Sequence, residues 1–240
     1  MDPALRQAWT DIVTADDYEE HMASIGQAQA AAELTAHLIR SAELTAGNRI
    51  TIVGAGTGQM FDFLVPAVFR LYCLTCADLN PVFLSRLRER LSRQGLEADI
   101  AEDDIERTAL ESGPDLLLAI LLLEHIDWRR GIEAFAGLRP GACGIIMQEN
   151  PPEMSTAVTP GRRLPPSIEK ALETAHPTLV PRGQLIGAMA EKGYALRDTA
   201  VRQVPDGKRL VGLLFRRASL TDGTDPVGRD TGEECAHPPK

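Results

Sequence analysis

Short apolar runs alternate with longer stretches of helical periodicity through the middle of the chain. The apolar runs are rich in branched residues, which predicts strands at residues 49–53, 71–78, 97–101, 114–120 and 142–149. Between them, apolar residues recur every three or four positions, which predicts helices. Because strands and helices alternate, we expect parallel pairing and a doubly wound α/β domain.

The end of the domain departs from this alternation. Residues 194–204 and 208–217 are rich in β-forming residues, and only Pro205, Asp206 and Gly207 separate them. A parallel crossover needs a much longer connection, so these two segments are expected to form a hairpin. The last strand of the sheet is therefore predicted to run antiparallel to its neighbour.

The chain divides into three zones by composition. Residues 1–48 are rich in alanine and predict a helical N-terminal cover, with a long helix capped by Asp16 or Asp17 and ending near Gly47. Residues 49–217 form the predicted α/β domain. Residues 218–240 are rich in glycine, proline and acidic residues, and we expect this tail to be disordered.

Two further helices have clear start signals. Asn80 before Pro81 is typical of a helix N-terminus, and the helix that follows carries the basic stretch from Arg86 to Arg93. Asp127 is expected to cap a second helix, which the sequence Arg139-Pro140-Gly141 ends.

Composition and charge exclude several classes of protein. The 240 residues carry a formal net charge of -9, which argues against a nucleic-acid-binding protein. The basic stretch from Arg86 to Arg93 is interpreted as a solvated helix face. The N-terminus lacks the pattern of a signal peptide, and the longest apolar run has only eight residues (116–123), too few for a membrane span. We therefore expect a soluble, cytoplasmic protein with no membrane partner.

A metal site is not expected. Cys73 and Cys76 form a lone CxxC motif with no second pair, and a strand would point residues three apart to opposite faces. Both are interpreted as ordinary thiols.

The first predicted strand leads into a glycine-rich loop. Gly54, Gly56 and Gly58 allow a sharp turn and a close approach of a ligand to the backbone, ahead of a helix expected to begin near Thr57. The second strand ends at Asp78, where a carboxylate can accept hydrogen bonds from both hydroxyls of a ribose. A nicotinamide dinucleotide is the less favoured ligand, because Gln59 takes the place of the third glycine of its fingerprint.

These segments resemble the class I S-adenosylmethionine-dependent methyltransferases, over about residues 49 to 217. The resemblance rests on five motifs: VGAGTG (53–58), ADLNP (77–81), EDD (102–104), PDLLLAILLLEHID (114–127) and LRPGACGIIMQE (138–149). The family's fold is a Rossmann-like, mostly parallel seven-stranded sheet with an antiparallel last strand, as the hairpin independently predicts.

The resemblance implies S-adenosylmethionine as cofactor and S-adenosylhomocysteine as product. It would place the loop of Gly54, Ala55, Gly56 and Gly58 along the methionine and ribose, Asp78 on the ribose hydroxyls and Leu79 against the adenine. Asp103 or, preferably, Asp104 would accept from the adenine amino group, and residues 121–125, beginning with Leu121, would line the methionine end. Ile52 departs from the family pattern, because an acidic residue often stands there.

Our hypothesis is methyl transfer from this cofactor to a small-molecule acceptor by in-line displacement. If the acceptor is a hydroxyl or an ammonium, a base must take a proton, and His125, Glu124, Glu149 and His21 are the candidates in that order. In many family members the N-terminal helices and the insert of residues 150–192 build the acceptor pocket, so Tyr18 is a further candidate contact. Two alternatives stay open: a nicotinamide-dependent oxidoreductase, and a non-catalytic cofactor-binding protein.

Overall fold

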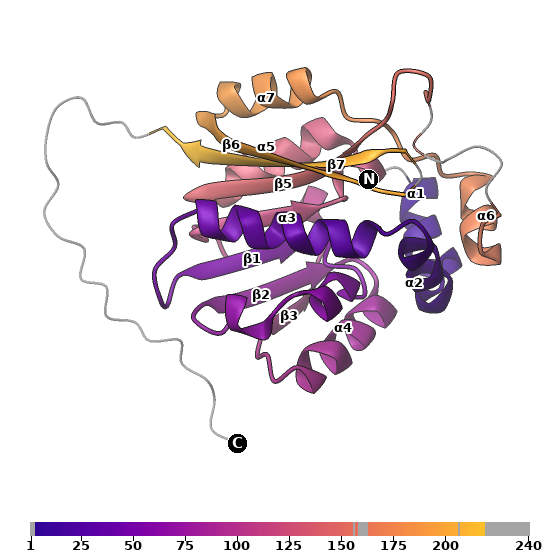
Figure 1. The fold of residues 1–240 in the computed structure, drawn as a ribbon, viewed down its shortest axis with the longest axis horizontal. Coiled ribbons are helices and arrows are strands. Elements are labelled where there is room, and N and C mark those ends of the chain that lie inside the picture. The colour runs from indigo at the N-terminus through magenta and orange to yellow at the C-terminus, as the bar shows by residue number, and fades with distance from the viewer. Residues whose placement is uncertain (1–2, 156, 158–162, 206, 219–240) are drawn as a thin grey trace, which may run out of the picture.

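A seven-stranded sheet organises the part of the chain that the structure, a computed structural model, describes: residues 3–155, 157, 163–205 and 207–218 (Figure 1). The strand order is β3-β2-β1-β4-β5-β7-β6. The strands are β1 (Arg49–Val53), β2 (Cys73–Asp78), β3 (Asp99–Glu102), β4 (Leu116–Ile120), β5 (Ala142–Glu149), β6 (Tyr194–Gln203) and β7 (Arg209–Arg217).

Strands β1 to β5 pair in parallel, whereas β7 lies antiparallel between β5 and β6. The register of β5 and β7 runs from Ala142 opposite Arg216 to Glu149 opposite Arg209. The predicted fold class is thus confirmed, including the antiparallel last strand. The strand order reverses between β1 and β4, which is where open α/β sheets form a crevice for ligands.

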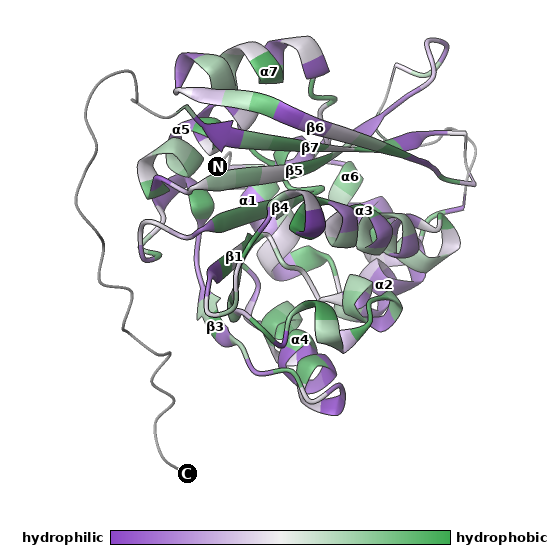
Figure 2. Cartoon of the chain, turned by 60° about the vertical axis from the view of Figure 1, so that its left-hand side comes forward, coloured by the Kyte–Doolittle hydropathy of each residue, from purple (hydrophilic) through white to green (hydrophobic). Residues whose placement is uncertain are grey.

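Helices cover both faces of the sheet. Helices α3 (Gln27–Ser41) and α4 (Pro81–Arg93) bury their apolar stripes against one face, in a cluster that includes Leu34 and Leu87. Helices α5 (Trp128–Leu138) and α7 (Arg182–Glu191) cover the other face, around Phe135 and Leu185. The hydropathy colouring shows apolar residues along the central strands (Figure 2).

The N-terminal region forms several helices where the sequence predicted one. Helix α1 (Pro3–Gln7), a π-helical turn (Ala8–Ile12) and α2 (Ala15–Ser24) precede α3. Gly26 breaks the predicted helix because it has a left-handed backbone (φ 66°) and the ring of Pro205 packs against it. The cap is Thr14, whose side chain accepts a hydrogen bond from the Asp17 backbone N–H, so the assignment to Asp16 or Asp17 was wrong.

The α-helix expected from Thr57 is also absent. A 3-10 helix (Gln59–Phe63) follows the glycine loop, and a second one (Pro66–Val68) comes soon after. Gly58 is left-handed (φ 69°) at the start of the first, and Val65 precedes a proline, which disfavours helical backbone there.

Arg90 does not lie on a solvated face as predicted for the basic stretch. Only 5% of it is exposed, and its guanidinium pairs with Glu19 and Asp62 while donating to the Thr57 carbonyl. This arginine therefore ties α4 to α2 and to the glycine loop.

Helix α6 (Pro166–Leu172) and α7 occupy the second half of the predicted insert. Figure 1 shows α1, α2 and α6 grouped beside one end of the strands. None of the described helices is long and apolar enough to cross a membrane. Residues 219–240 of the predicted disordered tail lie outside the described residues.

Candidate functional site

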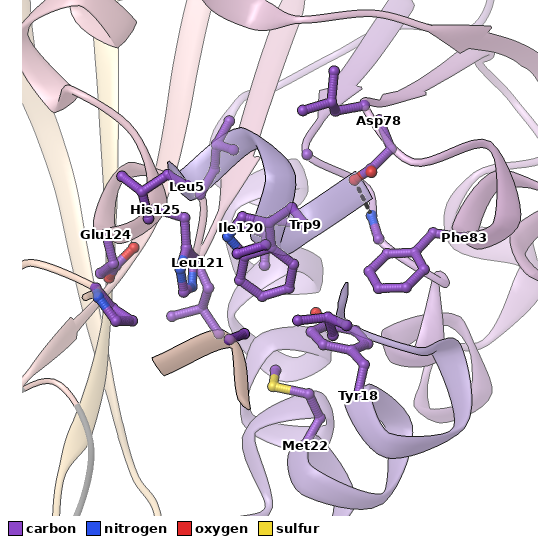
Figure 3. A pocket seen from close by; sticks show the side chains of 18 of the residues that line it. Leu5, Trp9, Tyr18, Met22, Asp78, Phe83, Ile120, Leu121, Glu124 and His125 are labelled. Atoms are coloured by element: carbon purple, nitrogen blue, oxygen red, sulfur yellow. Dashed lines mark hydrogen bonds between the residues drawn. The ribbon is translucent and has the colours of Figure 1, made fainter. Parts of the chain in front are cut away.

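A cavity lies at the carboxyl ends of β1, β2 and β4, where the strand order reverses (Figure 3). Its floor includes Val53, Ala77 and Ile120 at the strand ends. Side chains from the N-terminal helices and from α6 complete its walls, as the resemblance implied for the acceptor side. The cavity therefore joins the predicted cofactor site to the predicted cover.

The glycine loop forms one edge of this cavity. Gly54, Gly56 and Gly58 all have left-handed backbones, with φ of 65°, 57° and 69°. Gly54 and Gly56 line the cavity, whereas Gly58 and Ala55 border a smaller hollow beside it together with Tyr18. A Cβ atom on Gly54 would lie 2.7 Å from a methyl group of Leu122, so a side chain there would crowd the loop.

A substitution at Gly58 tests how tightly the glycine loop packs against its neighbours. An added Cβ would lie 2.2 Å from Leu87 Cδ1, and Leu87 is fully buried. We expect Gly58→Ala to destabilise the fold by about 2–5 kcal/mol, from left-handed backbone strain and overpacking together. Chemical denaturation measures this loss.

Gly95→Ala is the matched control for that measurement. Gly95 has a similar φ of 62° but open space around its Cβ position, so only the backbone strain of about 1–2 kcal/mol applies. Equal losses in the two variants would contradict the packing argument.

Asp78 lies at the end of β2 and is held by backbone donors. Its Oδ2 accepts from the Gly56 N–H at 2.8 Å and its Oδ1 from the Asn80 N–H at 2.9 Å. Burial raises the pKa of Asp78 above its ordinary value, while the hydrogen bonds from Asn80, Gly56 and Leu79 oppose that rise. Each carboxylate oxygen can accept a second hydrogen bond, so the group fits the two hydroxyls of a ribose.

The predicted adenine contacts also line the cavity. Leu79, Asp103 and Asp104 all face it. The Asp104 carboxylate is already paired with Arg6 at 2.6 Å; although partial burial works in the opposite direction, the hydrogen bond from Arg6 holds the pKa of Asp104 below its ordinary value. Asp103 accepts from the Ala109 N–H at 2.9 Å. Which of the two meets the adenine stays a prediction.

Glu124 and His125 follow β4 on a 3-10 turn (Leu123–His125). Leu121 precedes that turn with a φ of 52°, a conformation that is uncommon for leucine. Glu124 is 4% exposed, and its Oε1 accepts from the Gln148 N–H at 2.6 Å. Its Oε2 has no hydrogen-bond partner among the described residues, and burial raises the pKa of Glu124 to about 7.

His125 is held against an aromatic ring. Its imidazole lies 4.6 Å from the Trp9 ring, edge to face. Burial lowers the pKa of His125 to about 4, and the neighbouring His21 contributes to this. The imidazole is therefore neutral at pH 7 and only weakly basic.

The structure brings three of the four candidate bases to the cavity. Glu124, His125 and His21 line it. Glu149 does not, because its carboxylate pairs with Arg182 at 3.1 Å and with Arg209 at 2.8 Å.

Sequence reasoning missed most of the N-terminal contribution. The Trp9 ring packs against Tyr18 and Phe83 as well as His125, and the Trp9 carbonyl accepts from Asn80 Nδ2 at 2.6 Å. Together with the ion pair from Arg6, these contacts hold residues 3–12 over the predicted cofactor site. The apolar pattern around Trp9 signals a packed helix but not its partner.

Sequence reasoning also missed a cluster of buried polar side chains in the cavity wall. Gln27, Gln148 and Lys208 line it, although Gln27 and Gln148 are 121 positions apart in the sequence. No local motif marks such a long-range cluster. In the described part of the chain, no three histidine, cysteine, aspartate or glutamate side chains are grouped to hold a metal ion.

Comparison with known proteins agrees with this arrangement. Residues 50–141 match the family model of a methyltransferase domain. No curated protein sequence matches the chain.

Several solved structures share the fold at low identity. Magnesium protoporphyrin IX methyltransferase from Synechocystis PCC 6803, solved with S-adenosylhomocysteine, is 13% identical with a TM-score of 0.60, over 80% of this chain and 84% of that one. Geranyl diphosphate C-methyltransferase from Streptomyces coelicolor A3(2) is 12% identical with a TM-score of 0.56, over 77% and 78%. A 4+2 cyclase, SpnF, is 16% identical with a TM-score of 0.57, over 77% and 80%.

Residues 50–141 thus match a methyltransferase domain, and the fold around them is the Rossmann-like fold of these solved methyltransferases. This agrees with the class I S-adenosylmethionine-dependent methyltransferases, which the sequence motifs resemble.

Proposed function

We propose that this protein transfers a methyl group from S-adenosylmethionine to a small-molecule acceptor. The observation that carries the proposal is the shared cavity: Asp78 and the glycine loop stand on one side of it, and Glu124 on another. One cavity thus offers a candidate nucleoside site and a candidate proton acceptor.

The residues present fit the cofactor. Asp78 has acceptor capacity for the ribose hydroxyls, Gly54 and Gly56 line the cavity without side chains, and Leu79 offers an apolar surface for the adenine. Bound S-adenosylmethionine supplies an electrophilic methyl group on a sulfonium. The chain's own contribution is chiefly to position the acceptor, which can be worth about 7–11 kcal/mol for well-aligned groups.

Glu124 is our first candidate for the proton acceptor, ahead of His125. A base works best when its pKa lies near the working pH, and the pKa of Glu124 is about 7 whereas that of His125 is about 4. Its Oε2 has no hydrogen-bond partner within the described residues and is therefore available for an acceptor hydroxyl.

The helices around the cavity favour a small acceptor. Residues 3–12, α2 and α6 close it from outside, with Arg6 paired to Asp104 and the Thr14 N–H donating to Ser167 Oγ at 3.1 Å. Glu124 is only 4% exposed, so a small molecule can reach it more readily than a polymer can.

Two binding measurements and one turnover measurement test the proposal. We expect S-adenosylhomocysteine to raise the melting temperature and to bind in calorimetry, and NAD to do neither. Incubation with radiolabelled S-adenosylmethionine and a metabolite extract should then yield a labelled small molecule. Stabilisation by NAD alone would favour an oxidoreductase, and binding without transfer to any acceptor would favour a non-catalytic protein.

A further inference from the structure

The wall of the cavity next to Glu124 is apolar. It comes from α6 and its flanking residues, and the Thr178 N–H after α6 donates to the Glu124 carbonyl oxygen at 2.8 Å. Within residues 163–180, every residue that lines the cavity is apolar: Leu164, Ile168, Ala171, Leu172, Ala175 and Pro177. Ser167 and Glu169, which are polar residues of α6, do not line it. The wall therefore offers a ligand no side-chain hydrogen bond and suits an apolar molecular body.

Three buried polar side chains elsewhere in the cavity wall are hydrogen-bonded within the protein. Gln27 Nε2 donates to Gln148 Oε1 at 3.1 Å, and Gln148 Nε2 donates to Asn150 Oδ1 at 2.8 Å. Lys208 Nζ donates to the Ala157 carbonyl oxygen at 2.7 Å. These three side chains therefore have protein partners before any ligand binds.

The Glu124 carboxylate, in contrast, has one oxygen without such a partner. Its Oε1 accepts from the Gln148 N–H at 2.6 Å, whereas its buried Oε2 has no hydrogen-bond partner in the part of the chain that the structure describes. The buried Nδ1 of His125, the next residue of the same turn, has none there either. Figure 3 shows both side chains on the side of the cavity away from Asp78. A buried acceptor is costly to leave without a donor, so a ligand group that donates to Oε2 would stabilise it.

Building on the proposed function, we propose that the acceptor is an apolar molecule with a hydroxyl group, and that this hydroxyl donates its hydrogen bond to Glu124 Oε2. The apolar wall holds the body of the molecule, and the hydroxyl fixes which end faces Glu124. The hydroxyl oxygen is also the methylated atom. The methyl group replaces its proton, which passes to Glu124 Oε2, so the products are a methyl ether and S-adenosylhomocysteine.

The same groups disfavour other acceptor classes. A carboxylate would bring a negative charge and no donor to Glu124 Oε2. An ammonium has three donors, and only one of them can be used by this oxygen. A sugar would place hydroxyl groups against Leu164 and Ile168 without partners, which is unfavourable in a buried site. A single hydroxyl on an apolar body satisfies both the wall and the carboxylate.

Three probes of similar size test the inference on the complex with S-adenosylhomocysteine. They share a naphthalene body: 2-naphthalenemethanol carries a hydroxyl, its methyl ether has no donor, and 2-naphthylmethylammonium carries a positive charge. At pH 8 Glu124 is mainly a carboxylate, because its pKa is about 7. We expect calorimetry to show that the alcohol binds about tenfold tighter than the ether, as one hydrogen bond to a charged group would give. The alcohol should also bind more tightly than the ammonium.

Glu124→Gln assigns the preference to one atom. The amide keeps the size of the side chain and its oxygen stays on the Gln148 N–H, so its NH2 group takes the place of Oε2. Both the alcohol and the ether can accept from that NH2 group, so the ratio of their dissociation constants should fall to about one. Glu133→Gln is the matched control and should keep the tenfold ratio, because Glu133 is an exposed residue of α5 that does not line the cavity.

Ile168→Ala tests the apolar wall separately. Ile168 is 8% exposed and lines the cavity from α6. Removing its outer carbons should weaken the binding of the alcohol and of the ether by the same factor, about threefold or more, and leave their ratio near ten. Unchanged affinities for both probes would overturn the placement of the apolar body against α6.

The outcomes separate the two proposals. If S-adenosylhomocysteine does not bind, the proposed function fails before any probe is tested. If it binds but no probe does, the apolar acceptor class is overturned. If the alcohol has no preference over the ether, if the ammonium binds more tightly, or if the preference survives in Glu124→Gln, the hydroxyl at Glu124 is overturned. In each of these last cases the cofactor still binds and the proposed methyl transfer stands with another class of acceptor.

Discussion

Replacing Asp78 with alanine is expected to weaken the binding of S-adenosylhomocysteine by at least 100-fold. The carboxylate holds the Gly56 and Asn80 N–H groups and has remaining capacity for two ribose hydroxyls. A hydrogen bond to a charged group is worth about 1.5–3 kcal/mol, so two of them correspond to about 100-fold or more. Isothermal titration calorimetry measures the change directly.

Asp115→Ala is the matched control for this result. Asp115 also accepts a backbone hydrogen bond, from the Arg49 N–H at 2.7 Å. However, it stands just before the amino end of β4, whereas Asp78 stands at the carboxyl end of β2. We expect the control to lose stability with an unchanged dissociation constant. If both variants bind S-adenosylhomocysteine as the wild type does, Asp78 does not hold the ribose.

The second large effect is expected at Glu124. Glu124→Gln should lower kcat by about 10²- to 10⁴-fold, the usual contribution of a general base, with little change in the affinity for S-adenosylhomocysteine. The acceptor from the extract experiment serves as substrate. Glu149→Gln is the control, because Glu149 pairs with arginines outside the cavity, and its kcat should change only a few-fold.

The pH dependence provides a separate readout for Glu124. Only the carboxylate can accept a proton, and its pKa is about 7, so kcat/KM of the wild type should rise with pH through an inflection near 7. The inflection should vanish in Glu124→Gln. A wild-type profile that is flat across pH 6–8 would exclude Glu124 as the base.

Glu124 should also affect stability: the free energy of unfolding should fall as pH rises, whereas kcat/KM should rise. A carboxyl whose pKa is raised on folding favours the protonated native state, so the native protein loses stability as pH rises from the ordinary value of 4.5 toward 7. Glu124→Gln removes this slope. Chemical denaturation at pH 5 and pH 8 therefore compares wild type and variant without any acceptor.

Local sequence signals predicted the sheet and the cofactor side of the site. The strands β1 and β5 begin and end as predicted, because their apolar runs are bounded by turn residues. Asp78 and Gly54 line the cavity because a parallel sheet brings strand ends to one edge, whatever the intervening sequence.

The remaining features depend on contacts between distant segments. Gly26, where the predicted helix breaks, lies against Pro205 from the hairpin near the C-terminal end of the domain. The burial of Arg90 depends on Glu19 and Asp62, which local periodicity cannot place. Lys208 precedes an ordinary strand in the sequence, and only the folded sheet brings it beside Gln148.

The contacts of the first dozen residues have a kinetic consequence. Arg6 is paired with Asp104, and the Trp9 carbonyl is bonded to Asn80, directly above the predicted nucleoside site. Because Asp104 is a predicted adenine contact and Asn80 follows the predicted ribose contact by two residues, we expect cofactor exchange to disturb these contacts. We therefore expect the release rate of the spent cofactor to depend on how readily residues 3–12 detach from the rest of the domain.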